Sequence, residues 1–79
     1  MDKLTKQVID DLNFLIGRTH EKRGPITSNM ACLGVITEEY HEVVEAFRSG
    51  EAHRMRAELI DLANAANRCI VALDAGEWS

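Results

Sequence analysis

One stretch of the chain, Thr37–Asp61, strongly restricts how this protein can fold. It contains two acidic pairs separated by fifteen residues, namely Glu39 with Glu42 and Glu58 with Asp61. The i,i+3 spacing within each pair places both carboxylates on one face of a helix, about one turn apart. Ser49-Gly50 lies between the pairs and favours a turn. We therefore predict two helices that fold back on each other, so that four carboxylates can converge.

Converging carboxylates repel one another, and their removal from water is unfavourable unless a cation joins them. The simplest candidate is a hard divalent cation with oxygen ligands, Mg²⁺ or Mn²⁺. The alternative is a solvated acidic face, which is the usual role of a single pair of this kind. Two pairs that both flank an apolar stripe favour the metal site, with Glu39, Glu42, Glu58 and Asp61 as candidate ligands.

The rest of the chain also has helical character. Apolar residues recur at helical spacing, and Pro25 is the only proline. The pattern predicts an all-α single domain over residues 1–79, with helices over 2–20, 29–48 and 52–75. Asp2 is a suitable N-cap for the first helix, Thr27 or Ser28 for the second, and Gly76 a suitable end for the third.

The second and third helices each carry an apolar stripe that we expect to form the core. On the second helix the stripe comprises Met30, Leu33, Ile36, Tyr40, Val43, Val44 and Phe47, and on the third Met55, Leu59, Leu62, Ala66, Cys69, Ile70 and Leu73. The four candidate ligands are predicted on the flanks of these stripes. Glu38 and Glu45 are predicted to face solvent.

A chain of 79 residues buries only a small core, so association is the expected source of extra stability. Phe14 lies off the apolar face of the first helix, and Ile60 and Val71 lie on the far side of the third. These positions predict a homo-oligomer, a dimer or a tetramer, packed as a larger bundle. Cys32 and Cys69 have no metal-binding spacing and are interpreted as small, reduced residues at the edge of the core.

Charge and hydropathy exclude some partners. The net charge of −4 argues against binding to a nucleic acid polymer. No apolar run approaches the ~20 residues that span a membrane, and the first residues lack a signal-peptide pattern. We therefore expect a cytoplasmic protein with no membrane partner. A basic cluster, Arg18, His20, Lys22 and Arg23, is consistent either with a solvated loop or with phosphate binding.

The acidic residues also resemble a known family. Glu38-Glu39-Tyr40-His41-Glu42, followed by Glu58-Leu59-Ile60-Asp61, is similar to the EExxE…ExxD signature of the MazG-like all-α nucleotide pyrophosphohydrolase superfamily, which includes dimeric dUTPases and phosphoribosyl-ATP pyrophosphohydrolases. The resemblance covers about residues 29–75. It implies Mg²⁺-dependent hydrolysis of a nucleoside triphosphate to the monophosphate and pyrophosphate, as in nucleotide-pool housecleaning.

The resemblance also implies roles for individual residues. Glu39, Glu42, Glu58 and Asp61 would hold the metal, and Glu38 or Glu42 would act as general base towards the attacking water. Cationic side chains would bind the phosphates, with Lys22, Arg23 and Arg68 as candidates. Asn64 could donate or accept a hydrogen bond with the base or sugar, although an exposed or subunit-contact role fits it equally well.

The chain departs from the family pattern in three places. Val35-Ile36-Thr37 contains no lysine before the first motif, and Leu62-Ala63-Asn64-Ala65 contains no aromatic residue after the second. We also expect the C-terminal nucleotide-binding segment of many family members to be missing, because the sequence ends at Ser79. Two other interpretations therefore stay open. One is a non-catalytic helical interaction module that pairs with a partner's basic residues. The other is an impaired relative that binds nucleotide as a sensor.

Overall fold

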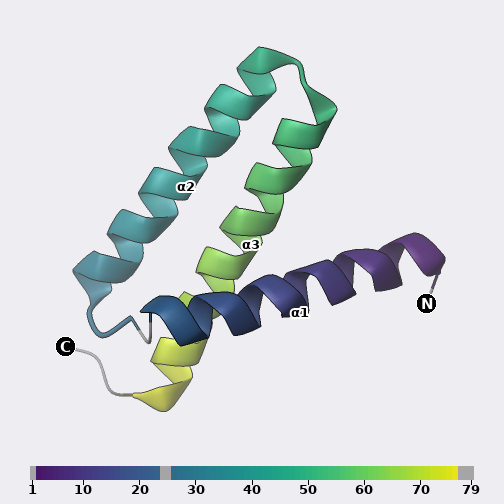
Figure 1. The fold of residues 1–79 in the computed structure, drawn as a ribbon. Coiled ribbons are helices and arrows are strands. Elements are labelled where there is room, and N and C mark those ends of the chain that lie inside the picture. Colours follow the sequence, from purple (N-terminus) through teal and green to yellow (C-terminus); the bar gives the residue numbers. More distant parts are fainter. Residues whose placement is uncertain (1, 24–25, 77–79) are drawn as a thin grey trace.

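Three helices make up the protein, as the sequence predicts. The computed structural model describes residues 2–23 and 26–76, so Pro25 lies outside the described residues (Figure 1). The helices are α1 (Lys3–Arg23), α2 (Asn29–Ser49) and α3 (Ala52–Ala75), and the described residues contain no strand. The all-α prediction is confirmed, although α1 extends three residues beyond its predicted end. No helix in the described ranges is long and apolar enough to cross a membrane.

Local capping interactions explain where the helices begin and end. The backbone N–H of Thr5 donates to Asp2 Oδ1 at 2.8 Å, and that of Ala31 donates to Ser28 Oγ at 3.0 Å. These side chains satisfy N–H groups that have no partner within the helix. Gly50 and Gly76 end α2 and α3 with φ angles of 74° and 65°, a left-handed conformation that glycine adopts without steric cost.

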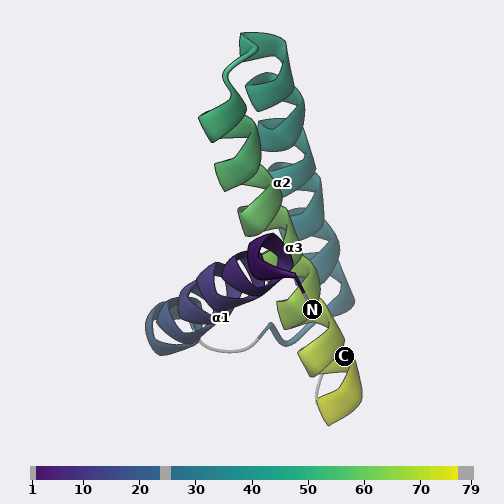
Figure 2. The same ribbon diagram turned by 90° about the vertical axis from the view of Figure 1, so that its right-hand side faces the viewer.

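Helices α2 and α3 lie side by side, joined by a turn at Gly50, and α1 crosses α3 (Figures 1 and 2). Two contacts fix the crossing. Arg56 Nη2 donates to Asp11 Oδ2 at 2.8 Å, and Asn64 Nδ2 donates to Thr19 Oγ1 at 3.0 Å. All residues from Asp2 to Asp10 are exposed, so the first half of α1 extends beyond the helix that it crosses.

The face that α2 and α3 bury against each other coincides only in part with the apolar stripes predicted from the sequence. Few apolar residues are buried, and all but Ile26 are small: they are Ile26, Ala46, Ala65, Cys69 and Ala72. Small side chains let two helices approach closely, and carboxylates occupy positions between them. Ile36 and Cys69 of the predicted stripes belong to this small core, so that part of the prediction is confirmed. The prediction is wrong for the larger stripe residues that are exposed, which are Met30, Leu33, Tyr40, Phe47, Leu59, Ile70 and Leu73.

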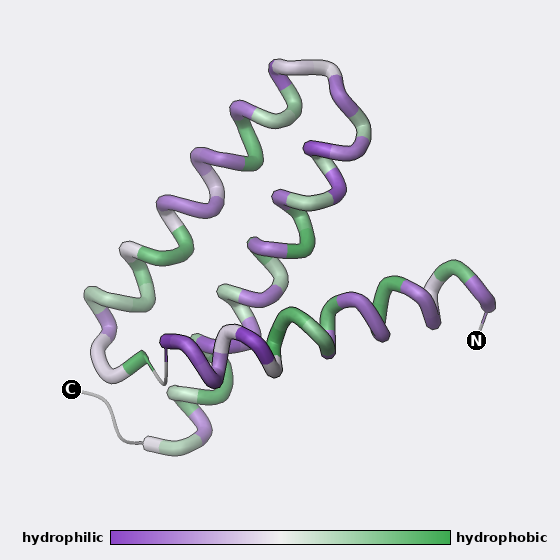
Figure 3. Tube along the Cα trace, viewed as in Figure 1, coloured by the Kyte–Doolittle hydropathy of each residue, from purple (hydrophilic) through white to green (hydrophobic). Residues whose placement is uncertain are grey.

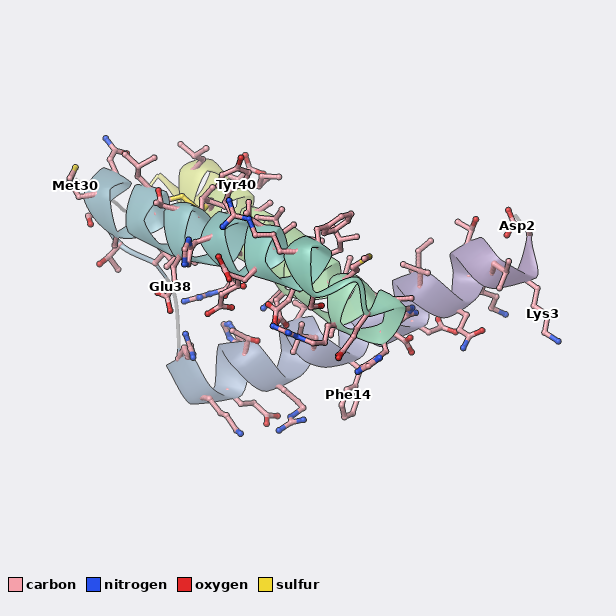
Figure 4. The ribbon with its side chains drawn as sticks, turned by 90° about the horizontal axis from the view of Figure 1, so that it is seen from above. Asp2, Lys3, Phe14, Met30, Glu38 and Tyr40 are labelled. Atoms are coloured by element: carbon pink, nitrogen blue, oxygen red, sulfur yellow. A yellow bond between two sulfur atoms is a disulfide. The ribbon has the colours of Figure 1, made fainter. Side chains whose placement is uncertain are left out.

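Much of the predicted core is exposed. The exposed fraction is 76% for Met30, 62% for Tyr40 and 51% for Phe47. Hydrophobic segments recur along all three helices, including the first half of α1 (Figure 3). Phe14 projects from α1 away from the other helices, whereas Tyr40 lies on the opposite side of the molecule, on α2 (Figure 4). A single protomer leaves these surfaces uncovered within the described residues.

A disulfide joins Cys32 of α2 to Cys69 of α3, whose Cα atoms are 5.8 Å apart. The expectation of reduced thiols is therefore wrong in this structure. The two cysteines lie on the facing sides of adjacent helices, beside Ala72 and Ile26 in the small core. Sequence spacing did not indicate this pairing, because 37 positions separate the two residues.

Candidate metal centre

Four carboxylates from two helices meet at the contact between α2 and α3. Glu39 and Glu42 come from α2, and Glu58 and Asp61 come from α3. One oxygen from each of these side chains lies within 4.8 Å of the corresponding oxygens of the other three. All four residues are half-buried. The convergence predicted from the two acidic pairs is thus present in the structure.

The carboxylates converge because they belong to the contacting faces of the two helices. On α2, Glu39 and Glu42 continue the row of Cys32 and Val35 and precede the buried Ala46, at spacings of three and four residues. Such spacing keeps residues on one side of a helix. The four acidic residues were predicted on the flanks of the apolar stripes, and in the structure they lie where the two helices meet.

Electrostatics at this cluster favours a cation. Burial, followed by the charges of Glu42, Asp61 and Glu58, raises the pKa of Glu39 from 4.5 to about 7. Burial and the neighbouring Glu42 also raise the pKa values of Glu58 and Asp61. Each shift means that the ionised form is disfavoured while the charges stand unopposed.

The residues of the cluster also have unused ligand atoms. Glu39 Oε2 and Glu58 Oε2 are buried and accept no hydrogen bond within the described part of the chain. The ion pairs found among the described residues join Arg48 to Glu45, His53 to Glu51 and Arg56 to Asp11, and therefore leave the cluster unpaired. An all-oxygen donor set with unsatisfied carboxylates fits Mg²⁺ or Mn²⁺.

A cavity of about 180 Å³ adjoins the cluster. Its polar lining residues are Thr19, Arg23, Glu39, Asp61, Asn64 and Arg68. Carboxylates and guanidinium groups thus share one cavity without an ion pair between them among the described residues. Burial, and then the like charge of Arg23, lowers the pKa of Arg68, so an anion in the cavity would relieve this repulsion.

The structure separates the other candidate residues. Arg23, Asn64 and Arg68 line the cavity, whereas Lys22 is exposed and is not part of its lining. Glu38 is exposed and lies outside the group of four carboxylates. Glu45 is also exposed, as predicted.

Thr19, which was not predicted from the sequence, lines the same cavity and accepts a hydrogen bond from Asn64. A threonine near the end of an amphipathic helix has no distinguishing sequence signal, and its partner is 45 residues away. Comparison of the chain with protein-family models, curated proteins and solved structures found no match. The resemblance to the MazG-like superfamily therefore depends on the acidic motifs and on their convergence.

Proposed function

We propose that this protein is a Mg²⁺-dependent nucleoside triphosphate pyrophosphohydrolase of the MazG-like type. The observation that carries the proposal is the convergence of four carboxylates within 4.8 Å, two from each of two helices, beside a cavity that also contains two arginines. The carboxylates suit a hard cation, and the arginines suit phosphate oxygens. Mn²⁺ is the alternative metal.

The proposed reaction adds one water to the triphosphate. A bond forms between the water oxygen and the α-phosphorus, and the bond from the α-phosphorus to the α,β-bridging oxygen breaks. The bridging oxygen leaves as part of pyrophosphate, and the monophosphate remains. Mg²⁺ held by Glu39, Glu42, Glu58 and Asp61 would supply charge neutralisation to the phosphate oxygens. We assign the general base to Glu42 rather than Glu38, since only Glu42 belongs to the cluster.

Arg23 and Arg68, which line the same cavity as Glu39 and Asp61, would bind phosphate oxygens. Their charges favour a ligand with several negative charges, because each guanidinium can form two parallel hydrogen bonds to one anionic group. The exposed Lys22 would contribute only after a change in its side-chain position. A polyphosphate that extends from the carboxylates to the arginines would use both halves of the cavity.

We also propose that the protein works as a homo-oligomer, a dimer or tetramer in which the pair of antiparallel helices α2 and α3 forms part of a larger bundle. The support is the exposed apolar surface of Met30, Tyr40 and Phe47, together with a core of small residues. A cytoplasmic location would suit a nucleotide substrate. The Cys32–Cys69 disulfide argues against that location, because cytosolic thiols are usually kept reduced.

The test is pyrophosphate release from canonical and modified ribo- and deoxyribonucleoside triphosphates, with Mg²⁺, Mn²⁺ or EDTA. We expect metal-dependent release that Glu39→Gln abolishes. Glu45→Gln is the matched control, because Glu45 lies on the same helix but is exposed and pairs with Arg48. A folded protein that releases no pyrophosphate from any substrate would refute the enzyme proposal and leave nucleotide sensing or helical interaction.

A further inference from the structure

Asn64 is a buried polar residue with an unused acceptor in the cavity beside the carboxylates. The residue is 7% exposed. The amide nitrogen Nδ2 donates to Thr19 Oγ1 at 3.0 Å, across the contact between α3 and α1. The amide oxygen Oδ1 is buried and has no hydrogen-bond partner among the described residues. Asn64 and Thr19 both line the cavity.

The hydroxyl of Thr19 fixes which end of the amide faces the cavity. A hydroxyl group has one hydrogen, and Thr19 Oγ1 donates it to the carbonyl oxygen of Leu15 at 2.9 Å. While Thr19 donates to Leu15, its oxygen accepts the hydrogen bond from Asn64 Nδ2. In this arrangement the nitrogen of the amide faces Thr19, and the oxygen is left for another group.

The nearby Arg68 has the opposite requirement. Its Nε is a buried donor without a partner in the described structure, one helical turn beyond Asn64 on α3. An ionised phosphate oxygen would satisfy Arg68, but it offers no hydrogen to Asn64. Buried polar groups in folded proteins nearly always find partners. A ligand that satisfies this cavity must therefore bring both an anionic acceptor and an O–H or N–H donor.

We propose that Thr19 positions Asn64 so that Asn64 Oδ1 accepts a hydrogen bond from an O–H or N–H donor of the bound ligand, while Arg68 Nε donates to a phosphate oxygen. This inference rests on the proposed nucleotide function and adds a requirement for the ligand, which must carry a hydrogen-bond donor as well as a phosphate. The donor is a hydroxyl or amino group of the nucleotide, or a water of the cation's hydration shell. Thr19 is a positioning residue that acts through Asn64.

The side-chain amide of Asn64 provides a direct test. The sequence contains only five side-chain amides, those of Gln7, Asn13, Asn29, Asn64 and Asn67, so their ¹⁵N–¹H NMR signals can be assigned by substitution. The additions are Mg²⁺ alone, Mg²⁺ with pyrophosphate, and Mg²⁺ with α,β-imido analogues of ribo- and deoxyribonucleoside triphosphates. Because the analogues resist cleavage at the α,β position, the signals report binding rather than turnover.

We expect the Asn64 signals to shift when an O–H or N–H donor binds to Asn64 Oδ1. A shift with Mg²⁺ alone identifies a hydration water, whereas a shift only with nucleotide identifies a nucleotide hydroxyl or amino group. Pyrophosphate occupies the phosphate end and controls for effects transmitted from Arg68. Asn64 signals that stay unchanged with every addition overturn the inference.

Two variants of Thr19 test the positioning role. Thr19→Ser retains the hydroxyl, and Thr19→Val replaces it with a methyl group of similar shape. We expect Thr19→Val to bind the ligand that shifts the Asn64 signals about tenfold more weakly than the wild type, because the variant loses about one net hydrogen bond. Thr19→Ser retains the hydroxyl and should bind this ligand as the wild type does. Equal binding by Thr19→Val and the wild type would overturn the proposed role.

A double variant separates positioning from general damage to the fold. If Thr19 acts through Asn64, then Thr19→Val should have no further effect on binding in an Asn64→Leu background. Additive losses would overturn the positioning role. Pyrophosphate release without a response at Asn64 overturns this inference but leaves the proposed function standing. A response at Asn64 without pyrophosphate release supports this inference and overturns the proposed pyrophosphohydrolase activity.

Discussion

Replacing Glu39 with glutamine should stabilise the metal-free protein at alkaline pH and abolish its stabilisation by Mg²⁺. Glu39 is the residue of the carboxylate cluster whose pKa rises to about 7, chiefly through burial and then through the charges of Glu42 and Asp61. Glutamine keeps the shape of the side chain and removes the charge. The variant therefore isolates the electrostatic strain that the proposed cation would relieve.

The sign and size of the effect follow from the pKa. The pKa of Glu39 is higher in the folded protein than its ordinary value of 4.5, so the folded state binds the proton more tightly. This stabilisation is fully present below pH 4.5 and is lost as the pH rises through about 7. The shift corresponds to about 3 kcal/mol. Solvent screening of a half-buried group reduces it, so we expect Glu39→Gln to gain ~1–3 kcal/mol at pH 8 in EDTA.

Urea denaturation of the wild type and the variant, at pH 5 and pH 8 with EDTA, measures this difference. The matched control is Glu38→Gln, which removes the same charge from the exposed neighbouring position and should change stability little. Mg²⁺ at one hundred times its Kd should stabilise the wild type alone, by about 2.7 kcal/mol, and so remove most or all of the variant's advantage. A variant no more stable than the wild type at pH 8 in EDTA would refute this account of the cluster.

Three other outcomes test separate parts of the structure. Reduction of the Cys32–Cys69 disulfide, which spans 37 positions, should lower the unfolding free energy by ~2–4 kcal/mol in urea melts, and a Cys32→Ser/Cys69→Ser variant should not respond to reductant. Phe47→Glu should shift sedimentation towards the protomer, because it places a charge on an exposed apolar surface. The control His53→Glu, a change at an exposed polar position, should leave sedimentation unchanged. A wild type that already sediments as a protomer contradicts the oligomer proposal. Arg68→Lys should raise KM about tenfold, because lysine lacks the planar contacts of a guanidinium with phosphate. The rise in Tm that Mg²⁺ induces in this variant should stay unchanged, and so should the activity of the control variant Arg48→Lys. An unaltered KM would remove Arg68 from the substrate site.

The sequence was sufficient for local features and insufficient for contacts between distant segments. Helix ends depend on neighbouring residues, so Ser28 and Gly76 could be predicted as caps and Gly50 as part of a turn. The convergence of the acidic pairs followed from helical spacing and one short turn. The crossing of α1 over α3 did not, because the Thr19–Asn64 contact joins residues 45 positions apart.

The buried faces of α2 and α3 were predicted only in part, for a related reason. Hydrophobic periodicity identifies the apolar side of a helix, but it does not say whether that side meets another part of the same protomer. Here α2 and α3 meet through small residues such as Ala46 and Ala65, with the carboxylates beside them. The larger apolar residues, among them Phe47, remain exposed.

The exposure of these larger apolar residues affects the stability of the protomer. The helix contact carries four carboxylates that repel one another near neutral pH, while the side chains able to bury the most apolar surface face outwards. A protomer built this way gains little from its own core, since hydrophobic stabilisation scales with the apolar area removed from water. Cation binding would relieve the repulsion at the contact, and association would cover the apolar faces. Since both events would stabilise the same pair of helices, we expect metal binding and association to favour each other.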